Sequence, residues 1–182
     1  MTIAYPRFFF LTLVALLLPL ATLAQSSPGY IRQSLPEATL VGQGLYRWFG
    51  LSIYKARLWG DKGKVTTAGW SGNPFALELE YTRTLYGEKI AIASLDEIKK
   101  LGLGTNAQHE QWLTEMKKIF PNVEEGQQLT GIYAPGQPSR FFFNGKSIGE
   151  IADPEFGPAF FGIWLHPKTS APKLRQLLLS SK

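Results

Sequence analysis

The sequence contains no cysteine, and only two of its 182 residues are histidines. Without cysteine there can be no disulfide bond, thiol nucleophile or thiolate metal ligand. The metal-binding patterns His-x-x-His and His-Glu-x-x-His are missing, and so is any clustered set of carboxylates. The G-x-S-x-G motif of serine hydrolases is missing as well. We therefore expect no metal, no other cofactor, and no thiol or serine hydrolase chemistry.

Charge of one sign is not concentrated anywhere along the chain. Lysine and arginine outnumber aspartate and glutamate by 19 to 14, and the basic residues occur at most in pairs such as Lys99-Lys100. Isolated pairs are typical of solvated helix faces, whereas nucleic-acid-binding proteins carry larger basic patches. We therefore expect no nucleic-acid partner.

Long apolar runs are also absent, except at the N-terminus. The run from Phe8 to Leu20 follows Arg7 and leads to the small residues of Thr22-Leu23-Ala24. This pattern predicts a signal peptide over residues 1–24, cleaved before Gln25. A retained membrane anchor is the alternative, although the run is shorter than the ~20 residues that span a bilayer. Export without disulfides favours the periplasm of a Gram-negative bacterium.

Residues 25–182 are predicted to form one domain, because this length supports one hydrophobic core and not two. Residues 25–35 are polar and indicate the N-terminal lead-in of the mature chain. Residues 75–81 alternate apolar and acidic residues, which predicts a strand with one buried and one solvated face. The predicted strands are residues 39–45, 49–59, 75–81 and 128–134, with a hairpin around Asn144-Gly145. The predicted helices are residues 88–101, 105–120, 153–164 and 170–179. Thr105, with Gln108 three residues later, predicts a capping box at the start of the second helix.

This order of elements predicts an α+β fold, in which helices pack on one face of a large, mainly antiparallel sheet. Thirteen per cent of the residues are aromatic, which is enough to fill the core and still line an apolar cavity between the sheet and the helices.

Two short segments contain the candidate site residues. Tyr46 and Arg47 end the segment that begins at Gly42, and Tyr86 and Lys89 lie three residues apart at the start of a predicted helix. Phenols, a lysine and an arginine suit the binding of an anion or the stabilisation of an oxyanion, especially at a helix N-terminus. The alternative is that these side chains are only a solvated helix turn, a solvated strand face and a surface aromatic.

The chain resembles the chalcone isomerase-like proteins, in particular their exported bacterial branch. The resemblance implies an α+β open-faced β-sandwich, with a ligand cleft between a large antiparallel sheet and the helices on one of its faces. The segments that carry it are Gly42-x-Gly44-Leu45, Ile53-Tyr54-x-Ala56-x-Leu58, Pro74 to Leu79, Tyr86 to Lys89, Gln128 to Tyr133, Phe143 to Lys146 and Phe160 to Leu165.

The resemblance also implies roles for individual residues. The plant enzymes of this family close a chalcone into a flavanone with a Tyr-x-x-Lys pair, an arginine, a threonine, and an asparagine four residues after the lysine. Tyr86 and Lys89 match the pair, and Tyr46 takes the apparent place of the arginine, with Arg47 one position later. The asparagine position falls on Ala93, and no threonine aligns. Other relatives bind fatty acids, whose carboxylate they hold with arginine and tyrosine.

Three functional hypotheses follow. The first is a periplasmic protein that binds a fatty acid or similar amphipathic anion, with Tyr46, Arg47, Tyr86 and Lys89 as ligand-binding residues. The second is an isomerase or intramolecular lyase, in which Tyr86 and Lys89 are catalytic residues that stabilise an enolate or phenolate oxygen. The third is a non-catalytic accessory protein that binds a partner and no small ligand.

Overall fold

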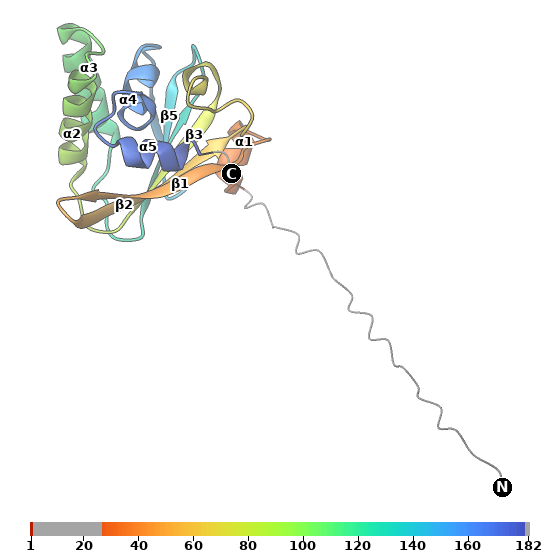
Figure 1. Cartoon of the computed structure of the whole chain (residues 1–182). Coiled ribbons are helices and arrows are strands. Elements are labelled where there is room, and N and C mark those ends of the chain that lie inside the picture. The colour runs from red at the N-terminus through yellow and green to blue at the C-terminus, as the bar shows by residue number, and fades with distance from the viewer. Residues whose placement is uncertain (2–26, 181–182) are drawn as a thin grey trace.

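The computed structural model describes residue 1 and residues 27–180, and it consists of one sheet with helices packed against it (Figure 1). Apart from its first residue, the predicted signal peptide at residues 1–24 lies outside the described part of the chain. Within that described part, no helix combines the length and the apolar character that crossing a membrane requires.

The sheet has six strands, and every neighbouring pair is antiparallel. Its spatial order is the same as the order along the chain, so each strand pairs with the strand that precedes it. The predicted α+β class with a large antiparallel sheet is confirmed. The strands are β1 (Thr39–Trp48), β2 (Leu51–Gly60), β3 (Phe75–Tyr81), β4 (Gln128–Tyr133), β5 (Ser139–Phe143) and β6 (Lys146–Ile151).

Four helices cover one face of this sheet, as the sequence predicts, and α2 and α3 run side by side in Figure 1. Between β3 and β4 the chain leaves the sheet to form α2 and α3, and after β6 it forms α4 and α5. The helices are α1 (Gly29–Ser34), α2 (Gly87–Lys100), α3 (Asn106–Ile119), α4 (Phe156–Leu165) and α5 (Pro172–Leu178), with a 3-10 turn at Trp70–Gly72.

The start of α3 follows directly from its sequence. The Thr105 hydroxyl accepts a hydrogen bond from the Gln108 backbone N–H at 3.3 Å, and the Gln108 side chain accepts one from the Thr105 N–H at 2.9 Å. This is the capping box that the sequence predicts, and it satisfies two backbone donors that a helix start leaves free.

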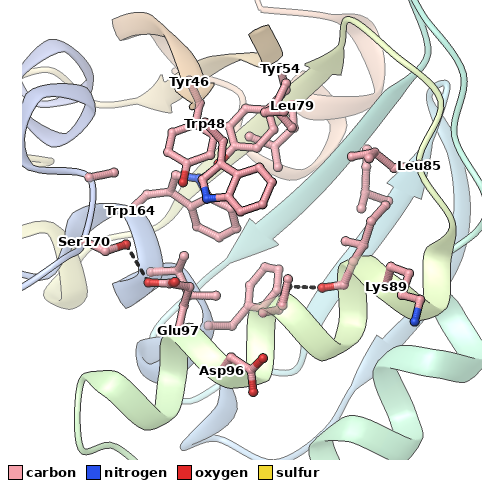
Figure 2. Close-up of a pocket in the computed structure, with 18 of the residues that line it drawn as sticks. Tyr46, Trp48, Tyr54, Leu79, Leu85, Lys89, Asp96, Glu97, Trp164 and Ser170 are labelled. Carbon is pink, nitrogen blue, oxygen red and sulfur yellow. Dashed lines mark hydrogen bonds between the residues drawn. The ribbon is translucent and has the colours of Figure 1, made fainter. Parts of the chain in front are cut away.

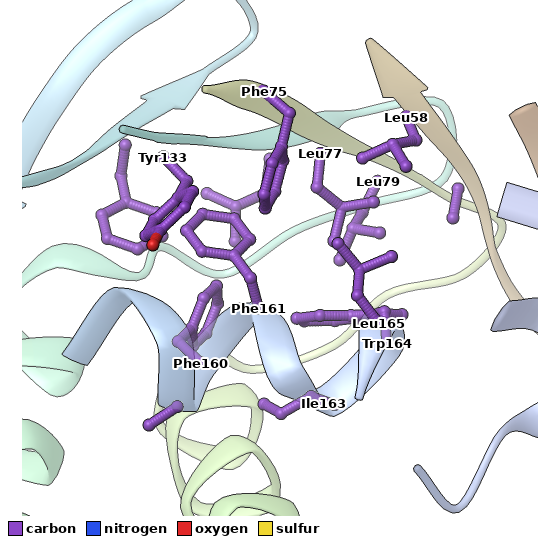
Figure 3. Close-up of a cluster of buried hydrophobic side chains, with 14 of the residues drawn as sticks. Leu58, Phe75, Leu77, Leu79, Tyr133, Phe160, Phe161, Ile163, Trp164 and Leu165 are labelled. Carbon is purple, nitrogen blue, oxygen red and sulfur yellow. The ribbon is translucent and has the colours of Figure 1, made fainter. Parts of the chain in front are cut away.

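The core lies between the sheet and α4, in which every residue except Pro158 is buried. Figure 3 shows rings of α4 packed against rings of the strands. The Phe161 ring lies edge-on to the Phe75 ring, with 5.1 Å between their centroids, and the Phe160 ring meets Trp164 at 5.4 Å. Such aromatic pairs add to the stabilisation from buried area. They also make α4 a rigid wall for the site described below.

The opposite face, which we call the outer face of the sheet, is not the solvated surface that the sequence predicts. Gly29–Ser34, part of the predicted lead-in, forms α1 and packs Ile31 against Trp59, Ala76 and Ile132. Strand residues that point away from the core are therefore covered as well. No helix is predicted there from the sequence, because a helix of six residues is too short to show a recognisable periodicity.

Glu78 of β3 lies in this outer face with only 2% of its side chain exposed. It accepts hydrogen bonds from Arg57 Nη1 at 2.5 Å and from the Tyr30 hydroxyl at 3.1 Å. Arg57 Nη2 also pairs with Glu80 at 2.7 Å. Burial and the nearby carboxylate raise the pKa of Tyr30, so its hydroxyl stays a donor. The prediction that this face of β3 is solvated is therefore wrong at Glu78, whose carboxylate is buried and paired with Arg57.

The turn between β1 and β2 also differs from the sequence prediction. The segment from Gly42 to Arg47 lies inside β1, and the chain reverses at Phe49-Gly50, where φ is 46° and 79°. The turn between β5 and β6 has nearly the same values at Asn144-Gly145, 48° and 78°. Asn-Gly is a recognised signal for this turn and Phe-Gly is not, so the sequence revealed only the second hairpin.

Candidate functional site

A cavity of about 530 Å³ lies between the sheet and the helices α2 and α4. Most of its wall is apolar, and a few polar groups border it, as is usual for small-molecule sites. The sheet contributes Tyr46, Trp48, Ile53, Tyr54, Leu79, Tyr81 and Leu129. The helices and their connections contribute Leu85, Lys89, Ile90, Ala93, Ser94, Asp96, Glu97, Lys100, Phe160, Ile163, Trp164, Ser170 and Ala171.

Helix α2 forms one long side of the cavity. Lys89, Ala93, Glu97 and Lys100 recur at the spacing of one helix face, and all four border the cavity. At 1.5 Å per residue the two lysines are roughly 16 Å apart along the helix axis. The cavity is therefore an elongated trough with a lysine near each end.

Two stacked phenols form the sheet side of the trough (Figure 2). The Tyr46 and Tyr54 rings lie 5.0 Å apart and nearly parallel, at 18°. The Tyr54 hydroxyl accepts a hydrogen bond from Trp164 Nε1 at 2.9 Å. Burial raises the pKa of both tyrosines, so both remain neutral at physiological pH and Tyr46 presents a neutral hydroxyl to the site.

An ion pair closes one end of the trough. Glu97 accepts hydrogen bonds from Lys100 Nζ at 2.6 Å and from the Ser170 hydroxyl at 2.5 Å. The bond from Ser170 is drawn in Figure 2. Burial opposes ionisation of Glu97, but these two donors outweigh it and lower its pKa. The charge of Lys100 is thus already matched. Nowhere in the described residues do three or more histidine, aspartate or glutamate side chains come together as metal ligands would.

Lys89, near the other end, is the cation without such a partner. Among the described residues, no carboxylate oxygen lies within 4.0 Å of its ammonium group, whereas the preceding residue, Glu88, pairs with Lys117 at 2.8 Å. Figure 2 shows the Lys89 amine directed away from the aromatic side chains. This side chain is exposed, so it can rotate toward a bound anion at small energetic cost.

The structure brings two of the four predicted site residues to this cavity. Tyr46 and Lys89 border it, and Arg47 and Tyr86 do not. Tyr46 and Trp48, on either side of Arg47, both border the cavity, and the β1–β2 pairing shifts register between Tyr46 and Arg47. Tyr86 is 64% exposed on the outside of the helix start. The expected convergence of all four side chains is therefore not formed, and their roles in binding stay predictions.

The N-terminus of α2 is also arranged differently from the simple anion site that the sequence suggested. The Gly87 backbone N–H donates to the Asn122 side-chain oxygen at 3.0 Å. One of the free donors expected there is therefore already used inside the protein. No sequence pattern could indicate this contact, because Asn122 lies after the next helix.

Sequence reasoning missed much of the cavity wall. Glu97 and Lys100 could have been found, because they continue the helix face of Lys89. Tyr54 and Trp164 gave no such signal, since their contact joins residues 110 positions apart.

Comparison with known proteins agrees with this architecture. The sequence pattern of the chalcone isomerase-like family matches residues 30–180. An uncharacterised protein of Haemophilus influenzae is 30% identical over 139 residues, which is 76% of this chain and 66% of that protein, so the chain spans just under two thirds of that relative.

The fold is similar to the crystal structure of an Arabidopsis thaliana fatty-acid-binding protein. The TM-score is 0.60 at 14% identity, and the match covers 78% of this chain and 86% of that one. At this identity the likeness shows the fold alone. The family pattern, in contrast, covers most of the chain and nearly the whole described domain. The chain therefore belongs to the chalcone isomerase-like family.

Proposed function

We propose that this protein binds a fatty acid or a similar amphipathic anion in the trough beneath α2. The observation that carries the proposal is the cavity itself, of about 530 Å³ and lined mainly by apolar side chains. A trough of this length suits an extended acyl chain better than a compact metabolite. The signal peptide predicted at residues 1–24 supports a periplasmic location for this binding.

The similarity to a fatty-acid-binding protein supports the same ligand class. That protein shares the fold over most of both chains. The cavity here has the chemistry that such a ligand requires, because apolar area buried against a hydrocarbon tail provides the main favourable free energy.

Lys89 is the residue proposed to hold the head group. Its charge is not matched by a carboxylate within the described residues, whereas Lys100 is already paired with Glu97. A bound carboxylate at Lys89 would form a charge-assisted hydrogen bond after rotation of the lysine side chain. The acyl chain would then extend along Ala93 toward Tyr46 and Tyr54.

The cavity favours binding over isomerase chemistry. An enzyme of the plant type needs a tyrosine and a lysine converging on one developing oxyanion. Lys89 borders the cavity, but Tyr86 does not. The Tyr54 hydroxyl already accepts a hydrogen bond from Trp164, and no described histidine borders the cavity to act as a base.

Native mass spectrometry of the protein purified from the periplasm tests the proposal directly. We expect a population with the added mass of a fatty acid or related lipid, and calorimetric binding of a long-chain fatty acid to delipidated protein. Ligand-free protein in the first experiment, together with no heat of binding in the second, would refute it.

Two pairs of variants locate the site. Ala93→Trp places a large ring in the trough and should abolish binding, whereas Ala107→Trp on the exposed face of α3 should not. Lys89→Met should weaken binding roughly tenfold by removing a charge-assisted hydrogen bond, while Lys99→Met, outside the cavity, should leave it unchanged. Equal affinities for the two lysine variants would exclude Lys89 as the head-group contact.

A further inference from the structure

The turn between β1 and β2 exposes large apolar side chains to solvent. We call residues 48–51 the hairpin tip; Trp48 is 58% exposed, Phe49 87% and Leu51 50%. The Trp48 and Phe49 rings contact each other edge-on, with centroids 4.8 Å apart. Exposed apolar side chains are ordinary when scattered, but three within four residues form a patch that indicates an interaction site.

The backbone of the tip shows that the phenylalanine is not there for the fold. Phe49 has a φ of 46°, a left-handed conformation that is unfavourable for a bulky side chain. The β5–β6 turn adopts nearly the same angles with Asn144, the residue type that suits this position. The chain therefore retains a strained and exposed ring where asparagine would serve the turn better, and such strain is found at functional positions.

The charge of this hairpin favours an anionic surface. Residues 39–60 contain three basic residues and no aspartate or glutamate. Arg57 is matched by Glu78 and Glu80 on the outer face. Arg47, exposed and next to Trp48, has no carboxylate within 4.0 Å among the described residues and so adds unmatched positive charge beside the tip.

The size and shape of the patch favour a membrane over a protein partner. Two exposed aromatic rings and a leucine present roughly 400 Å² of area, which is about half of what one partner of a stable protein interface buries. The patch is the convex end of a hairpin. Tryptophan and phenylalanine flanked by arginine are typical of segments that insert into the boundary between lipid head groups and acyl chains.

Trp48 connects this patch to the cavity, because it belongs to the tip and also borders the trough (Figure 2). We propose that the hairpin tip inserts into a phospholipid surface and holds the cavity mouth against it. An amphipathic ligand would then pass between membrane and trough without crossing water. The membrane contact stands on the tip alone; the transfer of a ligand rests on the proposed function.

Vesicle co-sedimentation of the purified chain tests the membrane contact. Vesicles of phosphatidylethanolamine and phosphatidylglycerol should retain the protein. Phe49→Asn should lower the partition coefficient by roughly tenfold or more, because it removes a ring that the lipid would bury. The unfolding midpoint of this variant should be unchanged or higher, since asparagine suits the turn. All variants carry the same N-terminal residues, so any affinity of these residues for lipid contributes equally to the partition coefficient of every variant.

Two further variants separate the causes. Leu177→Gln removes a leucine that is 49% exposed on α5, away from the tip, and should not change the partition. Arg47→Gln should lower binding roughly fivefold to vesicles with phosphatidylglycerol, and not to vesicles of phosphatidylcholine alone. Folded Phe49→Asn protein that binds vesicles like the unaltered chain would overturn the proposal. So would a tip-dependent dimer in sedimentation velocity without vesicle binding, which would assign the tip to a second copy.

The two proposals fail separately. Vesicle binding that depends on Phe49, without any fatty-acid binding by calorimetry, would leave the membrane contact standing and refute the proposed ligand. Fatty-acid binding without vesicle binding would refute the membrane contact alone.

Discussion

Replacing Arg57 by methionine tests the buried ion pair on the outer face of the sheet. The substitution keeps most of the side-chain volume but leaves Glu78, 2% exposed, with the Tyr30 hydroxyl as its remaining side-chain donor. Removal of one partner of a buried pair typically costs about 3–5 kcal/mol, because the other charge stays buried and unmatched. Glu80 is 33% exposed and can be hydrated, so it should add little to this cost.

The loss should be visible in both chemical and thermal unfolding. For a domain of this size each kcal/mol shifts Tm by about 2–4 °C, so Arg57→Met should melt roughly 6–20 °C lower. Urea unfolding followed by tryptophan fluorescence gives the free energy of unfolding independently.

The double variant Arg57→Met with Glu78→Met is the matched control. It removes both charges, so most of the loss should be recovered, because a well-packed apolar pair is often as stable as a buried ion pair. A single variant within about 1 kcal/mol of the unaltered chain, or a double variant as unstable as the sum of both singles, would refute the reasoning.

Two further predictions concern the close packing of Gly42 in β1 and the ion pair of Arg57 with Glu80. A methyl group at Gly42 would lie 2.2 Å from the Leu177 carbonyl oxygen, so Gly42→Ala should displace α5 and cost roughly 2 kcal/mol or more of stability. The control Gly72→Ala adds its methyl group in open space and should change stability by less than about 0.5 kcal/mol. Similar melting temperatures for the two variants would contradict this prediction. Hydrogen bonding to Arg57 lowers the pKa of Glu80 against the opposing effect of burial. The Glu80 carboxylate therefore contributes to stability above its pKa in the unfolded chain, about 4.3, and this contribution is lost as the pH falls through its lower pKa in the folded chain. In urea unfolding at pH values from about 3 to 6, Glu80→Gln should therefore lose less stability on acidification than the unaltered chain. The same dependence of the free energy of unfolding on pH in both proteins would count against this role of Glu80.

The sequence predicted those parts of the fold that depend on local chemistry. The capping box at Thr105 and the Asn144-Gly145 turn are each specified within four residues, and both are present. The prediction of helix α2 rests on apolar residues that recur at helical spacing. The short α1 was missed, because it is held by Ile31 packing on distant strands and not by its own pattern.

The candidate site was less predictable for a related reason. Tyr46 of β1 and Lys89 of α2 both border the cavity, and their roles in binding stay predictions. Arg47 could not be oriented, because a one-residue change in strand register reverses the face of every side chain. The contact of Tyr54 with Trp164 joins β2 to α4, and only the tertiary structure brings them together.

The sequential order of the six strands has a consequence for how the chain folds. Every strand pair joins strands that are consecutive along the chain, and all pairs except β3–β4 close a short connection and form early. The β3–β4 pair must wait for α2 and α3, which lie between the two strands. The last helix, α5, then packs across the first strand, with the Leu177 carbonyl against Gly42. The apolar side of β1 is therefore uncovered until the C-terminal residues arrive, and during synthesis it is an exposed apolar surface of the kind that promotes aggregation.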